Sequence, residues 1–239
     1  MTTLVFVGPT LPAVEVTARL PGAEVLPPVA VGDVLTLARS RRRITRIAII
    51  DGYFERMAAV WHKEILCALE RGIAVWGAAS MGALRAAELA PFGMIGVGSI
   101  YRAFASGELI ADDEVAVAHL PAEYGYAATS DALVDLRDGI ARAAPNLRTQ
   151  HALVELARVR FYRERTWAQL LEDARVAGLP RRQIETVAGW RRTHPRHSRK
   201  ADDARLLLRR LATTPPTRPR KIAVPRTWAL RRLEADLDR

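Results

Sequence analysis

The chain has 239 residues, 49% of them hydrophobic, with 36 basic and 26 acidic side chains and a formal net charge of +10. This length suits one large domain or two small ones with a sizeable core. The single cysteine, Cys67, excludes an internal disulfide and a thiolate metal site. Because no signal-peptide pattern and no long apolar run is present, we expect a cytoplasmic protein that does not span a membrane.

Charge is distributed unevenly along the chain. Residues 1–140 contain 12 basic and 16 acidic side chains, whereas residues 141–239 contain 24 and 10. Arginine supplies 33 of the 36 basic residues, which a GC-rich genome alone would produce, but codon usage does not decide where the charge lies. The asymmetry indicates an acidic partner for the C-terminal part. Interleaved aromatic residues and a base-reading motif are missing, so we expect no nucleic-acid binding.

Short apolar runs alternate with helical patterns through the first hundred residues. Strands are expected at residues 3–7, 24–31, 46–50, 73–76 and 94–97, and helices at 33–40, 57–71 and 81–89. This alternation predicts an open α/β fold with a mostly parallel, Rossmann-like sheet and helices on both faces.

The pattern changes near residue 130. Amphipathic helices are expected at residues 131–144, 150–165, 166–177, 180–192 and 202–211. The prolines of residues 213–219 predict a linker before a short terminal segment, 227–237. We therefore expect an α/β core domain over residues 1–125, an arginine-rich helical domain over 126–212, and a linker with a C-terminal segment over 213–239.

Ligands of open α/β sheets bind at the carboxyl ends of the strands, which directs attention to Ser80. The local sequence Ala-Ala-Ser-Met-Gly at a strand-to-helix turn resembles a nucleophile elbow, with alanine in the place of the first glycine. Unpaired N–H groups at the start of the next helix would stabilise an oxyanion there. The alternative is that Ser80 only caps this helix.

Two neighbouring helices carry further polar candidates. Met81, Arg85 and Glu88 share one face of an alanine-rich helix, so Arg85 either pairs with Glu88 or binds a ligand carboxylate. The consecutive residues His62, Lys63 and Glu64 spread over about 200 degrees of a helix and cannot all face one cleft.

His62 has two interpretations. It is a candidate general base for Ser80, oriented by Asp51, Glu55 or Glu88. Alternatively, it is a half-buried core residue on the stripe of Leu66 and Leu69. Asp51 itself follows a strand, where it either binds a ligand or only closes its own turn.

Two motifs argue weakly for a metal or a cofactor. Asp112, Asp113 and Glu114 are either a carboxylate metal cluster or a solvated turn before an edge strand, and carboxylates alone do not specify a metal. Gly96 and Gly98 are only half of a dinucleotide fingerprint. We therefore expect neither a metal nor a cofactor.

Several motifs in a fixed order resemble the TfuA family. They are Asp-Gly-Tyr-Phe from Asp51, Val-Trp-His-Lys-Glu-Ile-Leu from Val60, Gly-Ala-Ala-Ser-Met-Gly-Ala-Leu-Arg-Ala-Ala-Glu-Leu from Gly77, Gly-Met-Ile-Gly-Val-Gly from Gly93, and Asp-Asp-Glu-Val-Ala-Val from Asp112. The resemblance covers roughly residues 45–120 and weakens beyond about residue 140, so the basic helical half is expected to be particular to this chain.

The resemblance implies a partnership with YcaO enzymes, which activate a backbone amide with ATP and install sulfur as a thioamide in ribosomal peptides or in methyl-coenzyme M reductase. TfuA-like proteins are proposed to release sulfide from a small ubiquitin-like sulfur carrier with a C-terminal thiocarboxylate, or to act as non-catalytic adaptors that recruit or activate the YcaO enzyme or its precursor peptide. Homo-oligomerisation is left open.

Sulfide release is an acyl transfer, so the candidate residues acquire roles. Ser80 would attack the thiocarboxyl carbon, with His62 or Lys63 as the base and Arg85 holding the carboxylate or thiocarboxylate. A positioned water with Glu64 or Glu88 is the alternative to the serine. The residues expected to line the substrate site are Arg85, Asp51, Tyr53, Met81 and Gly82.

Overall fold

The computed structural model describes residues 2–54 and 57–238, so the expected candidate Glu55 lies outside the described residues. The chain divides into two compact units. The sheet unit combines Met1–Ile110 with Ala201–Arg239, and the helical unit is Ala111–Lys200.

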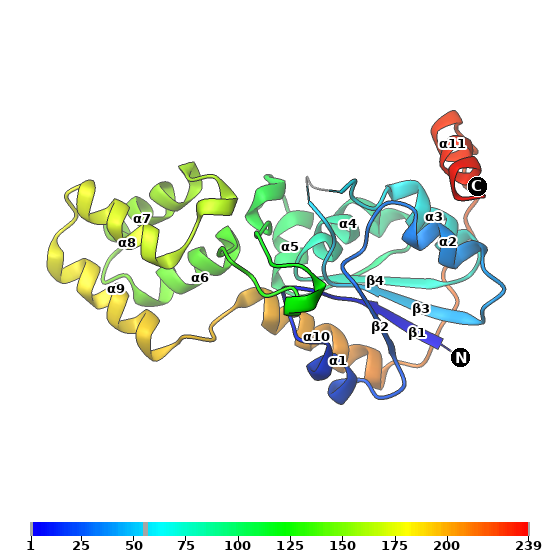
Figure 1. The fold of residues 1–239 in the computed structure, drawn as a ribbon, viewed down its shortest axis with the longest axis horizontal. Helices are drawn as coiled ribbons and strands as arrows, with labels where there is room; N and C mark the ends of the chain where they lie inside the picture. The colour runs from blue at the N-terminus through cyan, green and yellow to red at the C-terminus, as the bar shows by residue number, and fades with distance from the viewer. Residues whose placement is uncertain (1, 55–56, 239) are drawn as a thin grey trace. The chain divides into compact units, whose positions relative to one another are not determined.

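Five parallel strands form the sheet unit's centre (Figure 1), in the order β2-β1-β3-β4-β5. Their bounds are β1 Thr2–Phe6, β2 Glu24–Leu26, β3 Ile44–Ile49, β4 Ala74–Ala78 and β5 Ile95–Val97. The three central strands, β1, β3 and β4, are rich in Val, Ile, Leu and Ala and are mostly buried on both faces, as parallel sheets require, whereas the edge strands β2 and β5 are only partly buried. This strand order is that of flavodoxin-type sheets, whose switch point lies between β1 and β3.

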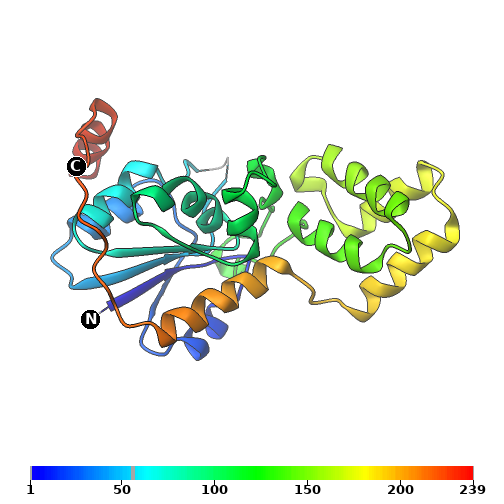
Figure 2. The ribbon, with the colours of Figure 1, turned by 180° about the vertical axis from the view of Figure 1, so that it is seen from behind.

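Helices cover both faces of the sheet (Figure 2). One face packs on α1 and α10, and the other on α2, α3, α4 and α5. The bounds are α1 Ala13–Arg19, α2 Asp33–Arg39, α3 His62–Glu70, α4 Met81–Leu89, α5 Ser99–Ala105 and α10 Arg199–Thr213. The predicted open parallel α/β sheet with helices on both faces is therefore confirmed.

The last 39 residues belong to the sheet unit. Ala204, Leu207 and Leu208 of α10 are fully buried against the sheet. The sequence pattern placed this helix with the arginine-rich helices, because an amphipathic stripe does not say which apolar surface it covers.

After α10 the chain passes the last residue of α3, where the N–H of Val224 donates to Glu70 at 2.8 Å, and continues into α11, Trp228–Leu237. The side chain of Leu230 is fully buried in the same core cluster as α2 and α3. Arg226 bonds Glu70 at 2.6 Å, and Arg39 bonds both carboxylate oxygens of Asp238 at 2.9 Å. The proline-rich stretch is thus followed by a segment that packs on the core.

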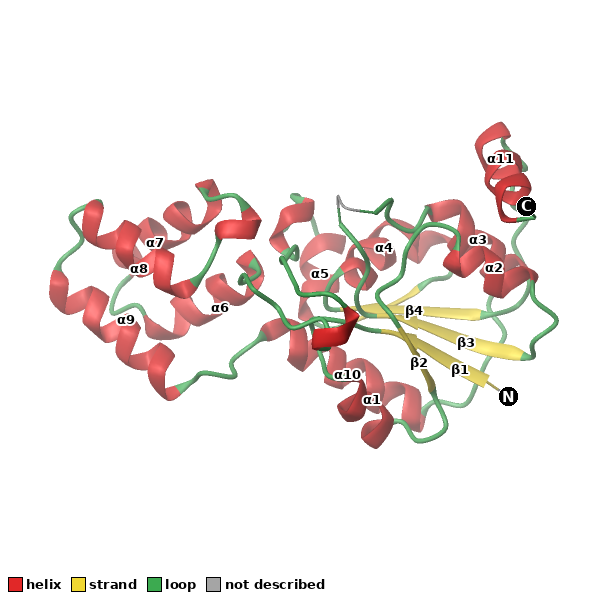
Figure 3. Ribbon diagram, viewed as in Figure 1, coloured by secondary structure: helices red, strands yellow, loops and turns green. Residues whose placement is uncertain are grey.

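The helical unit contains four α-helices within the described residues (Figure 3). They are α6 Leu133–Ala143, α7 Leu147–Val159, α8 Trp167–Val176 and α9 Arg181–Thr193, and three short 3-10 turns accompany them: η2 Asp112–Glu114, η3 Ala122–Tyr124 and η4 Tyr162–Glu164. The side chains of Asn146 and Thr166 cap α7 and α8 by accepting from the backbone three residues on.

The two units share the positive charge. The helical unit has 15 basic and 12 acidic residues, and the sheet unit has 21 and 14. The C-terminal basic surplus is therefore divided between the units, because α10 and the residues after it belong to the sheet unit.

Candidate functional site

Asp51 lies at the switch point between β1 and β3 and is almost completely buried. Its Oδ2 accepts hydrogen bonds from the backbone N–H groups of Gly8 at 2.9 Å and Thr10 at 3.0 Å. Its Oδ1 accepts from the Thr10 hydroxyl at 2.6 Å. The carboxylate therefore ties the loop after β1 to the end of β3, in the crevice where sheets of this order bind ligands.

Ser80 occupies the turn between β4 and α4 and is 7% exposed. The preceding Ala79 has φ of 67°, a left-handed conformation that residues with a Cβ rarely adopt. The turn is tight: a Cβ at Gly77 would overlap the backbone of Gly82, and one at Gly82 would overlap the carbonyl of Ile49. The small residues around Ser80 are thus required by close backbone packing, as the elbow pattern predicts.

The hydroxyl of Ser80 does not cap α4. Ser80 stands at the N-cap position, yet its side chain makes no capping hydrogen bond within the described part of the chain. The structure thus offers no support for a purely capping role.

The N–H groups at the start of α4 are mostly occupied. The N–H groups of Ser80 and Gly82 both donate to the carbonyl of Ile50, each at 3.3 Å. Met81 N–H has no backbone acceptor among residues 2–54 and 57–238. The expected oxyanion site at this helix start is therefore reduced to one candidate donor.

His62 lies away from Ser80. Its Nε2 is 2.8 Å from Glu88 Oε2, and the side chain is 46% exposed. Glu88 also binds Arg85 at 2.7 Å, which confirms the expected Arg85–Glu88 pair, and the Nε of Arg85 donates to the Val60 carbonyl at 3.1 Å. Since Glu88 follows Ser80 by eight residues, their Cα atoms are about 12 Å apart along the helix axis. His62 is neither the expected core residue nor placed as a base for Ser80.

Glu64 is fully buried and links the starts of two helices. Its Oε2 accepts from the N–H groups of Gly32 at 2.8 Å and Leu35 at 3.3 Å, and its Oε1 from that of Trp61 at 2.9 Å. Burial raises the pKa of Glu64 to about 7, and the three backbone hydrogen bonds oppose this shift. Lys63, the next residue back, is half-buried, so the three consecutive candidates point in different directions as expected.

Two residues expected to line the substrate site, Met81 and Gly82, serve packing. Met81 is 1% exposed in the core, directly against Gly52, where a Cβ would approach the Met81 side chain to 2.8 Å. Gly82 provides the close backbone approach at the turn. Tyr53 is half-buried, and its N–H donates to the carbonyl of Val29 at 3.0 Å.

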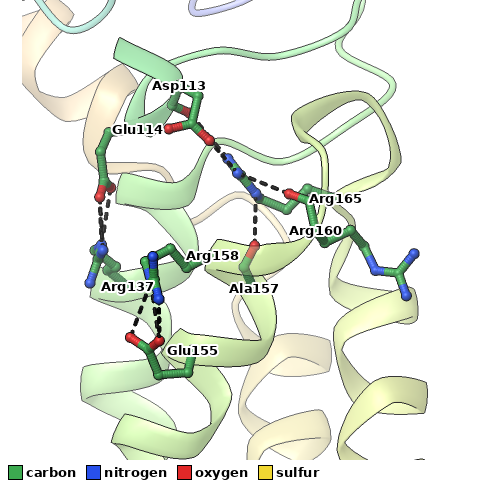
Figure 4. A network of polar contacts seen from close by, with 8 residues as sticks. All are labelled: Asp113, Glu114, Arg137, Glu155, Ala157, Arg158, Arg160 and Arg165. Carbon is green, nitrogen blue, oxygen red and sulfur yellow. Dashed lines mark hydrogen bonds and ion pairs between the residues drawn. The ribbon is translucent and has the colours of Figure 1, made fainter. Parts of the chain in front are cut away.

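The carboxylates after α5 bind arginines (Figure 4). Asp113 bonds the buried Arg165 at 2.6 Å, and Glu114 bonds Arg137 at 2.8 Å. The Glu114–Arg137 pair fastens η2 to α6, and the Asp113–Arg165 pair fastens it to the segment between η4 and α8, while Asp112 is exposed. The described residues contain no group that could hold a metal ion, and the edge strand expected after η2 does not form among them.

The start of α5 is filled by a carboxylate of the chain itself. Asp203 of α10 accepts from the N–H groups of Ser99 at 2.9 Å and Ile100 at 2.7 Å. A Cβ at Gly98 would overlap this carboxylate. The half fingerprint at residues 96–98 thus receives Asp203 at the position where a dinucleotide phosphate would bind.

Two hydrogen-bonding residues of the site could not be predicted from the sequence. Thr10 lies in the loop after β1, but a lone threonine carries no signal for pairing with an aspartate 41 residues away. Asp203 lies 104 residues from Ser99, in a helix with no visible link to the sheet. Only three-dimensional proximity reveals either contact.

A comparison with known protein families agrees with the sequence motifs. No helix in the described residues is long and apolar enough to cross a membrane. A comparison with curated proteins finds no match. A scan against protein families matches residues 51–166 to the TfuA-like protein family. The match reaches through α6 and α7 to η4, further than the motifs alone indicated. The resemblance is thereby confirmed: the segment that contains Asp51, His62 and Ser80 is similar to TfuA-like proteins.

Proposed function

We propose that this chain is a thioamidation accessory protein that works with a YcaO enzyme and releases sulfide from the thiocarboxylated C-terminus of a small sulfur carrier. The family match supports the association with thioamidation. The observation that carries the hydrolytic role is the turn at Ser80: a serine at a carboxyl strand end, after a left-handed alanine, whose hydroxyl does not cap its helix. Strained backbone of this kind is concentrated at functional sites.

The reaction does not need His62 as a base. In the proposed first step the Ser80 oxygen bonds to the thiocarboxyl carbon, the carbon–sulfur bond breaks, and the serine proton passes to the departing sulfur. The products are an acyl ester on Ser80 and hydrosulfide. Water then cleaves the ester, which returns the serine, the carrier carboxylate and a proton. The anionic sulfur of the substrate thus accepts the proton that an enzyme base would otherwise take.

The test is to incubate the purified chain with thiocarboxylated carrier and to measure sulfide and carrier mass over time. Ser80→Ala is expected to reduce release by roughly a hundredfold or more, the usual scale for loss of a nucleophile or its activation. Ser106→Ala, at an exposed helix end, is the matched control and should release sulfide normally. Undiminished release by Ser80→Ala would eliminate the serine mechanism and leave a positioned water.

The second candidate function is a non-catalytic adaptor that recruits or activates the YcaO enzyme or its peptide substrate. Two observations favour it: His62 binds Glu88 away from Ser80, and two N–H groups at the start of α4 are bonded to Ile50. The discriminating measurement supplies free sulfide to a thioamidation reaction. If free sulfide replaces the chain completely, sulfide release is its role; if the chain is still required, the adaptor role is correct.

A further inference from the structure

The starts of α7 and α9 lie side by side in the helical unit. The hydroxyl of Thr149, in the first turn of α7, donates to Oε1 of Gln183, in the first turn of α9, at 2.7 Å. Thr149 is buried. Oδ1 of Asn146 accepts a hydrogen bond from the Thr149 N–H at 2.9 Å and lies 3.0 Å from the Thr149 hydroxyl oxygen. Leu147 and Arg148 precede Thr149, and Arg181 and Arg182 precede Gln183, so these four residues flank the contact between the two helix starts. We call them the paired-start surface.

Three arginines of this surface oppose the electrostatics of their own helices. Arg148 is the second residue of α7, and Arg181 and Arg182 are the first two of α9. Neither helix has an acidic residue in its first turn. Cations at a helix start are unfavourable, because the helix dipole is positive there. Helix stability therefore does not explain these arginines.

Their charges are available to a partner. Arg148 and Arg182 are exposed, and no carboxylate among the described residues lies within ion-pair distance of either. Arg181 bonds Glu185 at 2.7 Å, but the two side chains are 92% and 60% exposed. Such an exposed pair contributes little and is readily exchanged for an outside carboxylate.

An apolar side chain accompanies the charges. Leu147, the first residue of α7, is 70% exposed beside Arg148. The helical unit as a whole contains 15 basic and 12 acidic residues, so an attraction for acidic groups comes from the arginines of this surface and not from the overall charge of the unit. Guanidinium groups bind carboxylates through paired hydrogen bonds, and an apolar anchor adds contact area that a phosphate backbone would not use.

We infer that the paired-start surface docks an acidic peptide segment of a partner polypeptide, with carboxylates on Arg148 and Arg182 and an apolar side chain on Leu147. Because the charged residues of this surface are all arginines, the chain that binds there must be rich in carboxylates. This docking is independent of the chemistry at Ser80, because every residue of the surface belongs to the helical unit.

The experiment titrates the full chain into a fluorescent peptide of repeated Glu-Glu-Leu units and follows anisotropy at several salt concentrations. Binding should weaken as salt rises. The double variant Arg148→Gln with Arg182→Gln should bind about fivefold or more weakly. Leu147→Ser should lower the affinity without changing the salt dependence. The same arginine variant should release sulfide from a thiocarboxylated carrier tail peptide at the rate of the unmodified chain, which separates this inference from the proposed function.

The matched control is Arg158→Gln with Arg175→Gln, which removes the same charge from two exposed helix faces where each arginine is paired with a glutamate of its own helix. This control should bind the acidic peptide within about twofold of the unmodified chain. Equal weakening by the control would show attraction by overall charge and overturn the inference. Equal binding of a Gln-Gln-Leu peptide, equal or tighter binding of single-stranded oligouridylate, or no binding of the acidic peptide at low salt would overturn it as well.

Discussion

His62 and Glu88 join the first residue of α3 to the last turn of α4, with the imidazole Nε2 2.8 Å from the carboxylate Oε2. Arg85 shares the same carboxylate oxygen at 2.7 Å. The three side chains form a surface cluster that holds the two helices together beside the sheet. The position of this cluster decides what His62 contributes to chemistry.

Substitution of His62 should leave sulfide release nearly intact. A general base supplies about 10²–10⁴-fold, so His62→Ala would cause a loss of that size if His62 activated Ser80. Because the imidazole of His62 binds Glu88, we expect the rate of sulfide release to change by no more than about threefold. The measurement is the initial rate of sulfide release from thiocarboxylated carrier. A hundredfold loss with unchanged thermal stability would contradict this placement.

Removal of the Asp51 carboxylate should destabilise the sheet unit. Asp51→Ala leaves the N–H groups of Gly8 and Thr10 buried without their acceptor, at about 1–3 kcal/mol for each. Urea unfolding should show the loss as a lower midpoint. Asp112→Ala is the control, since this exposed aspartate should change stability by no more than about 0.5 kcal/mol. Equal midpoints for the two variants would contradict the role of Asp51.

Glu64 should make folding stability depend on pH near neutrality. Its folded pKa is raised from 4.5 to about 7, so the folded state binds the proton more tightly than the unfolded state. This contribution is fully present below pH 4.5 and is lost as the pH rises through about 7. The difference in unfolding free energy between the unmodified chain and Glu64→Gln should therefore fall across this window, by an amount on the order of 3 kcal/mol.

The Glu64 measurement is urea unfolding of both proteins at a series of pH values. Using the difference between the two proteins removes the titration of other buried acids, such as Asp131 and Asp135, whose pKa values burial also raises. A difference that is constant with pH would show that Glu64 does not titrate in this range.

Two glycine substitutions should have opposite effects. Gly82→Ala places a Cβ on the Ile49 carbonyl, which forces the backbone apart and should lower stability by about 1–3 kcal/mol or prevent folding. In Gly189→Ala the new Cβ meets only the end of Arg192 at 3.7 Å within an exposed helix, so stability should rise by roughly 0.5–1 kcal/mol. Thermal denaturation measures both. A stabilised Gly82→Ala variant would contradict the close approach of α4 to the sheet.

Local patterns in the sequence predict much of the sheet and its edge. Apolar runs locate all five strands, and the small residues around Ser80 predict a tight turn, because strand burial and turn geometry are dictated by neighbouring residues. The placement of Asp51 at a strand end follows in the same way. These features need no information from distant parts of the chain.

Side-chain directions and long-range partners could not be predicted from local patterns in the sequence. The helix containing His62 was expected to begin near residue 57, but it begins at His62, where Glu64 binds the N–H of Trp61. His62 therefore stands at the exposed first position of the helix and not in the middle of the stripe that continues through Leu66 and Leu69. The partner of Asp51 lies 41 residues away and that of Ser99 lies 104 residues away, and neither distance leaves a periodic signal.

The position of α10 has a consequence for synthesis of the chain on the ribosome. All five strands are complete by residue 97, but the sheet face that Ala204, Leu207 and Leu208 cover has no α10 until residues beyond 200 emerge. The helical unit is made in this interval, between the two parts of the sheet unit. Nascent chains that are halted before residue 200 therefore present an uncovered apolar sheet face, which makes them substrates for chaperones and prone to aggregation.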